Sequence, residues 1–174
     1  VKKIVDSGLS VIGLTNYFKF DDKDFSLKKK LINEGIQTFL NLEVRLANVN
    51  KSDEMIDYHI IFNPKVEDSL IKNLLGSLKA KLGPTEKAFN QLTNDEIENH
   101  AAIDLDELLS KLNENGSGLH GNYITGFLSR GHGSATSDSE KKTQTIYEDI
   151  ARKTQILLHS SDNEGNVVKD REYW

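Results

Sequence analysis

Short apolar segments alternate with helical patterns along this chain, and this alternation constrains the fold more than any other feature of the sequence. Five segments have the length, apolar character and β-branched or aromatic content of buried strands. They lie at residues 10–15, 36–46, 57–62, 122–129 and 155–159. Helical spacing occurs at residues 2–9, 24–34, 66–80, 104–116 and 143–153. This order predicts one α/β domain with mostly parallel strands, in which residues 83–103 form an irregular, polar insertion.

Composition narrows the class of protein. Hydrophobic residues make up 37% of the 174 residues and charged residues 28%, as in soluble globular proteins. No apolar run approaches the roughly 20 residues of a membrane span, so we expect no membrane association and a cytoplasmic location. The absence of cysteine excludes disulfides, thiolate zinc sites and cysteine nucleophiles. A net charge of -5 argues against non-specific coating of nucleic acid but leaves a nuclease possible.

The two ends of the chain indicate a piece of a longer polypeptide. The sequence begins at Val1 and enters a helical pattern at once, and it ends on the aromatic pair Tyr173 and Trp174. Tag removal or N-terminal processing is the alternative explanation.

Polar side chains recur where the predicted strands end. In parallel α/β folds, functional sites lie at the carboxyl ends of the strands. Carboxylates and imidazoles are the ligands expected of a hydrolase with two or three metal ions. The candidates are Asn16 and Tyr17, Glu43, His59, the segment from Arg130 to His132, and the segment from His159 to Asp162.

The order of these segments resembles that of the PHP family (polymerase and histidinol phosphatase domains). The family pattern runs from a His-x-His strand to Thr-Asp-His, a Glu on a strand, a His opening the next strand, a later His-Pro and a final Ser-Asp-x-His. The similar segments here are GLSVIGLTNY, FLNLEVRL, DYHIIFNP, DLDELLSKLNENG with YITGFLSRGHGS, and LLHSSDNEGN. The resemblance covers most of the chain and is closest to the variant at the front of large ATPases of the chromosome-maintenance and ABC type. The His-x-His strand would then precede Val1.

The resemblance implies a distorted (β/α) barrel that would be incomplete at its first strand, and a set of site residues. It implies one or two divalent ions (Mn, Zn or Fe) held by Glu43, His59, His132 and Asp162. Catalytic roles would belong to Glu43, Asp162 and Arg130, the last as a phosphate-binding group. The chain departs from the family pattern at Asn16-Tyr17, where Asp-His would stand, and at Glu164, where His would stand. Because a phenol with a pKa near ~10 is a poor metal ligand, Tyr17 suggests an eroded metal position.

Each candidate also has an ordinary structural explanation. Glu43 could face solvent on an alternating strand, and His59 could be a half-buried histidine without a function. His132 lies in a glycine-rich loop, and Asp162 could be a turn residue. Tyr17 could stack on a substrate. We interpret His100, His120 and His159 as solvated or structural.

Three functions therefore stay open. The first is a PHP-like metal-dependent phosphoesterase or nuclease domain of a larger, ATPase-linked bacterial protein, which acts on a phosphate-containing or nucleic-acid substrate. The second is a catalytically inactive, PHP-derived binding or regulatory module for an ATPase region in the same or a partner chain. The third is an unrelated α/β ligand-binding domain.

Overall fold

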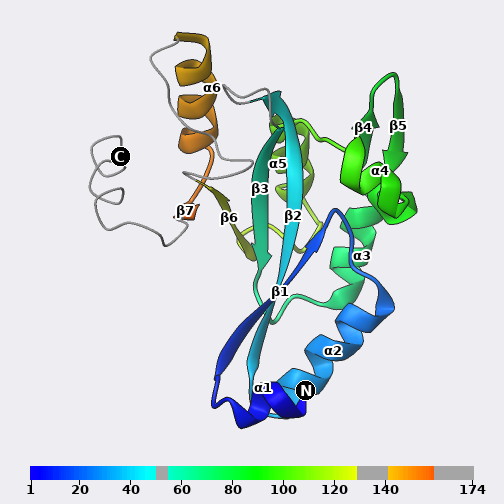
Figure 1. The fold of residues 1–174 in the computed structure, drawn as a ribbon, viewed down its shortest axis with the longest axis vertical. Coiled ribbons are helices and arrows are strands. Elements are labelled where there is room, and N and C mark those ends of the chain that lie inside the picture. Colours follow the sequence, from blue (N-terminus) through cyan, green and yellow to red (C-terminus); the bar gives the residue numbers. More distant parts are fainter. Residues whose placement is uncertain (50–54, 129–140, 159–174) are drawn as a thin grey trace.

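A five-stranded mixed sheet forms the centre of the structure, a computed structural model that describes residues 1–49, 55–128 and 141–158 (Figure 1). The order across the sheet is β1-β2-β3-β6-β7. The strands are β1 (Val11–Tyr17), β2 (Gln37–Val49), β3 (Met55–Phe62), β6 (Tyr123–Leu128) and β7 (Ile156–Leu158). The five strands predicted from the apolar segments are therefore confirmed, with shifted ends.

Four of the five strands run in the same direction, as predicted, but β3 is reversed between β2 and β6. β1 and β2 are parallel, as are β6 and β7, but β3 is antiparallel to both of its neighbours. A parallel connection needs a dozen or more residues, whereas only residues 50–54 separate β2 from β3, so these strands pair in opposite directions. Among the described strands, β1 and β7 are each paired on one side only. These five strands form an open sheet, so the structure does not confirm the distorted (β/α) barrel that the resemblance implies.

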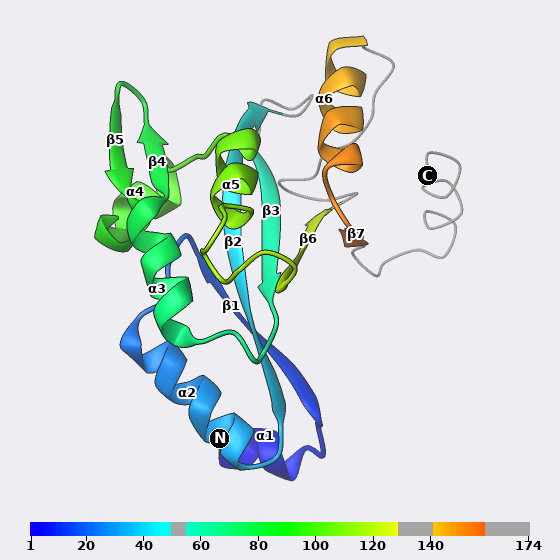
Figure 2. The same cartoon turned by 180° about the vertical axis from the view of Figure 1, so that it is seen from behind.

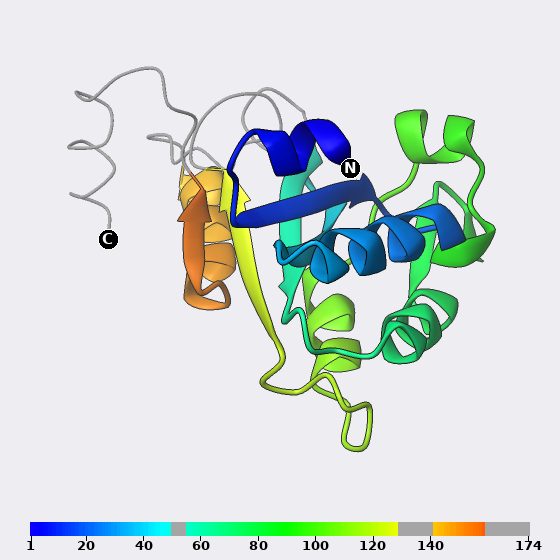
Figure 3. The ribbon, with the colours of Figure 1, turned by 90° about the horizontal axis from the view of Figure 1, so that it is seen from below.

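Helices cover one face of the sheet. In Figure 3, α2 (Asp22–Asn33), α3 (Asp68–Ser77) and α5 (Leu105–Leu112) lie on one side of β1, and the short α1 (Lys2–Asp6) lies on the other. The buried sheet residues in the core beneath the helices are Leu40, Leu42, Val44 and Leu46 of β2 and Ile56, Tyr58, Ile60 and Phe62 of β3. They are every second residue of each strand, because successive side chains of a strand point to opposite faces. The intervening residues therefore face away from these helices.

The helix starts follow the capping signals of the sequence. The Asp21 side chain accepts hydrogen bonds from the backbone N–H groups of Lys23 and Asp24, and Asp24 reciprocates in a capping box. At the start of α5, the Asp104 side chain accepts hydrogen bonds from the backbone N–H groups of Asp106 and Glu107. α6 (Lys141–Arg152) lies beside β6 and β7 (Figure 2). The ring centroids of Tyr147 in α6 and Phe127 in β6 are 5.8 Å apart, in an edge-to-face arrangement.

The predicted irregular insertion at 83–103 is instead ordered. It supplies β5 (Thr85–Ala88), which pairs with β4 (Lys79–Leu82), then a 3₁₀ turn η1 (Phe89–Gln91) and α4 (Asn94–Asn99). Phe89, Leu92 and Ile97 are buried, which explains how a polar segment can fold against α3. A bridge from Leu46 to Ile103 ties it to the main sheet, and a bridge from Lys81 to Ala102 ties it to β4.

No helix among the described residues has the length and apolar character needed to cross a membrane.

Candidate functional site

A row of three polar side chains crosses the sheet on the face away from the helices. Tyr17 at the end of β1 is the register partner of Glu43 on β2, and Glu43 is the register partner of His59 on β3. Directly opposed residues project to the same face, with Cβ atoms about 4.5–5.5 Å apart. The next position in the row is Gly126 of β6, which has no side chain. Glu43 and His59, predicted as two ligands of one site, are thus neighbours.

Two of the three side chains in this row are ionisable and buried. Glu43 is only 9% exposed and His59 only 8% exposed, although both are ionisable. Burial lowers the pKa of His59 below the ordinary histidine value, and the nearby Glu43 carboxylate partly opposes that shift. The imidazole is therefore neutral near neutral pH, which is the form that can ligate a metal ion or accept a proton.

Asn41 contacts the His59 ring at Nδ1. Its side-chain nitrogen lies 3.1 Å from Nδ1 of His59 and donates a hydrogen bond to Oγ1 of Thr15 at 3.0 Å. Its carbonyl oxygen Oδ1 is buried and has no hydrogen-bond partner among the described residues. Asn41 lies two residues before Glu43 on β2, on the same face.

Tyr17 faces the Glu43 carboxylate. Burial, a hydrogen bond that the phenol donates to Glu43 and the negative charges of Glu43 and Asp57 raise the pKa of Tyr17 to about 12. The guanidinium carbon of Arg45 lies 5.3 Å from the centre of the Tyr17 ring, a cation–π distance. The phenol therefore stays protonated at neutral pH and is a hydrogen-bond donor in the site.

Arg45 brings a positive charge to the same face of the sheet. Its guanidinium donates to the carbonyl of Ile97 in α4, and its Nε lies 4.0 Å from a carboxylate oxygen of Asp57. Asp57 is 6% exposed. Arg45 thus connects the ordered 83–103 segment to the polar row, and it partly neutralises the acidic groups there.

A left-handed backbone turn ends β1 next to the site. Phe18 has φ 56°, a conformation that non-glycine residues rarely adopt. Its backbone N–H donates to the carbonyl of Glu43 at 2.8 Å, and its fully buried ring meets Phe89 at 5.0 Å. These contacts hold the turn, and they place Tyr17 at the start of it.

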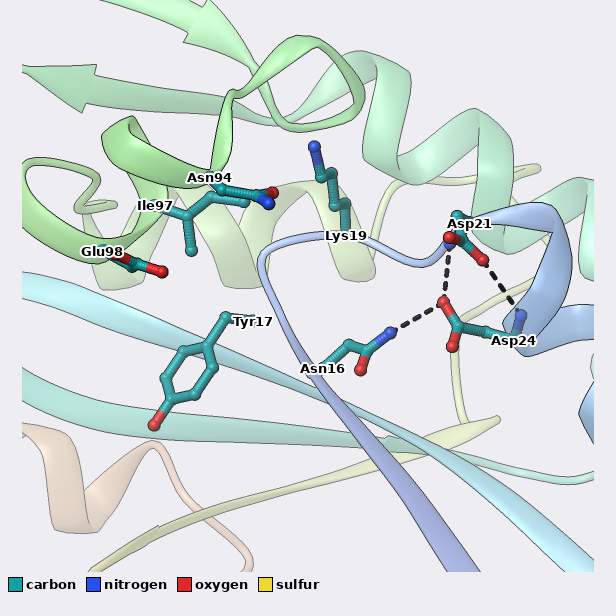
Figure 4. A pocket seen from close by; sticks show the side chains of 8 residues that line it. All are labelled: Asn16, Tyr17, Lys19, Asp21, Asp24, Asn94, Ile97 and Glu98. Atoms are coloured by element: carbon teal, nitrogen blue, oxygen red, sulfur yellow. Dashed lines mark hydrogen bonds between the residues drawn. The ribbon is translucent and has the colours of Figure 1, made fainter.

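Asn16 points to the opposite side and has a structural role. Its side-chain nitrogen donates to Oδ2 of Asp24 at 2.7 Å, and the same oxygen accepts the backbone N–H of Asp21 at 2.7 Å (Figure 4). Asn16 thereby ties the end of β1 to the cap of α2. A cavity of about 300 Å³ opens there, lined by Asn16, Tyr17, Lys19, Asp21, Asp24, Asn94, Ile97 and Glu98.

The remaining candidate residues fall into two groups, those outside the described residues and two exposed histidines. His132, Asp162 and Arg130, together with Glu164 and His159, lie outside the described residues. His100 and His120 are exposed, as predicted, and His120 contacts Asn113.

The described part of the site fits a divalent ion only in part. Glu43 and His59 offer a carboxylate and a neutral imidazole on one face, which are ligands that manganese, zinc and iron accept. Within residues 1–49, 55–128 and 141–158, no group of three or more His, Asp or Glu side chains is arranged to hold a metal ion. The described residues therefore supply two ligands of the predicted set.

Three polar residues of this face were missed by sequence reasoning: Asn41, Arg45 and Asp57. The signal was present, because Asn41 and Arg45 alternate with Leu42 and Val44 in the same way as Glu43 does. That alternation places all three β2 side chains on one face, so the choice of Glu43 implied its two neighbours.

Comparisons with protein-family models, with curated proteins and with solved structures gave no match to this chain.

Proposed function

We propose that this chain is a PHP-like, metal-dependent phosphoesterase or nuclease domain, linked to an ATPase region in the same or a partner chain. The observation that carries the proposal is the pairing of Glu43 with His59 across β2 and β3. Both side chains are buried, and both lie on the face that the covering helices leave to polar residues. His132 and Asp162 would complete the ligand set, and the open sheet would be part of a PHP-like barrel.

The chemistry of the pair supports this role. A buried carboxylate beside a neutral imidazole is costly in the fold unless both groups have partners or a ligand. Burial keeps His59 unprotonated, so its ring does not compete with a cation for the Glu43 charge. A bound divalent cation would supply an activated water and would stabilise negative charge on a phosphoester.

Arg45 and Tyr17 lie on the same face as the Glu43–His59 pair, and their roles follow from their contacts. Arg45 brings a guanidinium to the same face, and guanidinium groups suit phosphate oxygens. The Tyr17 phenol stays protonated beside Glu43 and helps to orient that carboxylate. We therefore assign Tyr17 to positioning and not to metal binding.

The test is metal content and manganese-dependent hydrolysis of a model phosphodiester by the purified protein. Glu43→Gln keeps the shape of the side chain but removes its charge, so it should lower both metal content and activity by more than about 100-fold. Glu34→Gln is the matched control: Glu34 is exposed at the end of α2, so the variant removes the same charge away from the site and should leave metal content and activity close to wild type. Thermal unfolding of each variant checks that the fold is kept. Equal activity of Glu43→Gln and wild type would refute the proposal.

A specific observation favours a second candidate, an inactive binding or regulatory module derived from the same fold. Glu43 raises the pKa of Tyr17, so a neutral phenol lies beside the carboxylate that a metal ion would otherwise use. Such a module would bind its ATPase partner without metal. Wild-type protein that retains no manganese or zinc and hydrolyses no phosphodiester would favour this candidate over the first.

A further inference from the structure

We infer that Asn41 selects the tautomer of His59, and that it favours the form with the proton on Nε2 and not on Nδ1. This makes Asn41 a positioning residue that opposes the binding of a metal ion through Nε2. The consequence for metal binding rests on the proposed function, whereas the tautomer itself is a property of the metal-free protein.

The first step is the count of hydrogen bonds around the Asn41 amide. Its NH₂ group has two N–H donors, and two acceptors lie within reach: Oγ1 of Thr15 at 3.0 Å and Nδ1 of His59 at 3.1 Å. With this orientation both donors are used. Nδ1 must then accept, so the single proton of the neutral ring lies on Nε2.

The second step compares the opposite orientation of the amide. Turning the amide would let the carbonyl oxygen accept from Thr15 and from an N–H at Nδ1 of His59. The NH₂ group would then occupy the buried position where Oδ1 has no partner among the described residues. In the turned orientation two buried N–H donors would have no partner, whereas in the observed orientation only one carbonyl oxygen has none among the described residues. Because each buried group without a partner is unfavourable, the orientation that donates to His59 is preferred.

The third step concerns ligation. A ring nitrogen that carries a proton has no lone pair for a metal ion, so His59 in this tautomer cannot bind through Nε2. To bind, the proton has to move to Nδ1, and the Asn41 amide has to turn to accept it. Ligating histidines are usually held in the reverse way, with the second ring N–H donating to an acceptor. Asn41 therefore works against the affinity of the Glu43–His59 pair for a cation.

Asn41→Asp tests this directly, because a carboxylate can only accept hydrogen bonds. The variant should shift His59 to the tautomer with the proton on Nδ1. The readout is the nitrogen NMR spectrum of metal-free protein labelled in its histidines, recorded near pH 8, with His59→Asn used to assign the signals. Wild type should show a protonated Nε2 on His59, and Asn41→Asp should show a protonated Nδ1. A protonated Nδ1 in the wild-type protein would overturn the inference without the use of any variant.

Calorimetric titration with manganese then measures the consequence. Asn41→Asp should tighten binding by about 10- to 100-fold, the range typical of groups that orient a metal ligand. Ala47→Asp is the charge control: Ala47 is exposed and lies on the same face of β2, so it adds the same charge without reaching His59. Equal tightening in both variants would show that charge alone acts, and would contradict a role for the tautomer. Absence of manganese binding in wild type and in both variants would refute the proposed function and leave the NMR result to decide the tautomer.

Discussion

The two faces of the central sheet are both buried near their middle, yet they are built on different chemistry. On the face toward the helices, the alternating residues of β2 and β3 from Leu40 to Leu46 and from Ile56 to Phe62 are at most 1% exposed. Nearly all of them are hydrophobic, and Tyr58 is the exception. On the other face, Glu43 and His59 are 9% and 8% exposed and touch polar neighbours. Burial alone therefore does not identify a core: apolar contacts stabilise one face, whereas the other depends on specific hydrogen bonds and charges.

The largest expected effect comes from the apolar face. Leu42→Ala removes buried methyl groups at a position with 0% exposure, and the cavity left behind should lower the free energy of unfolding by about 2–5 kcal/mol. The control is Ile124→Ala on the opposite face, where Ile124 is 43% exposed and the loss should stay below about 1 kcal/mol. Urea denaturation measures both. Similar losses in the two variants would mean that the second face also acts as an apolar core.

A smaller effect is expected from the polar face. Arg45→Met keeps much of the side-chain volume but removes the charged donor to the Ile97 carbonyl, which should cost about 1.5 kcal/mol of unfolding free energy. Lys29→Met is the control, because Lys29 is 73% exposed and its ion pair with Asp68 at 3.5 Å should contribute less than about 1 kcal/mol. If Arg45→Met were neutral in the same denaturation experiment, the polar face would contribute no measurable stability through Arg45.

The smallest effect is a difference between two tyrosines on opposite faces. Burial and Glu43 raise the pKa of Tyr17 to about 12, whereas burial alone raises that of Tyr58, whose phenol contacts Thr125 and Thr154. Glu43→Gln should lower the pKa of Tyr17 but leave it above ~10, since burial is the largest cause. The pKa of Tyr58 should not change. Carbon NMR of ring-labelled tyrosine follows both, and equal shifts in the two rings would contradict a local effect of Glu43.

The raised pKa of Tyr17 makes the stability of the fold depend on pH. Folded Tyr17 retains its proton at pH values where the unfolded chain, with an ordinary tyrosine pKa near ~10, loses it. The free energy of unfolding should therefore decrease as pH rises from about 10 to about 12, and Tyr17→Phe should reduce that decrease.

Local sequence signals predicted most of the helices and strands. They also pointed to Tyr17, Glu43 and His59 on the polar face, but not to Asn41, Arg45 and Asp57. Helical spacing predicted α5, and short apolar segments predicted β2 and β3. The resemblance added Glu43 and His59 as partners, and the structure places them opposite each other. The segment 83–103 was misjudged because its buried residues, such as Phe89 and Ile97, are few and widely spaced. Neither helical nor strand periodicity reveals burial that depends on contacts with α3.

The sequence by itself determined most of the strands and helices, those within residues 79–99 excepted, and which side chains share a face, because caps and alternation act between residues close in the chain. Only the tertiary structure decided that β3 runs antiparallel to β2 and β6, that the described strands leave the sheet open, and that Asn41 reaches His59. These are pairings between segments distant along the chain. Their register depends on the packing of the whole apolar face against its helices, and no local pattern encodes it.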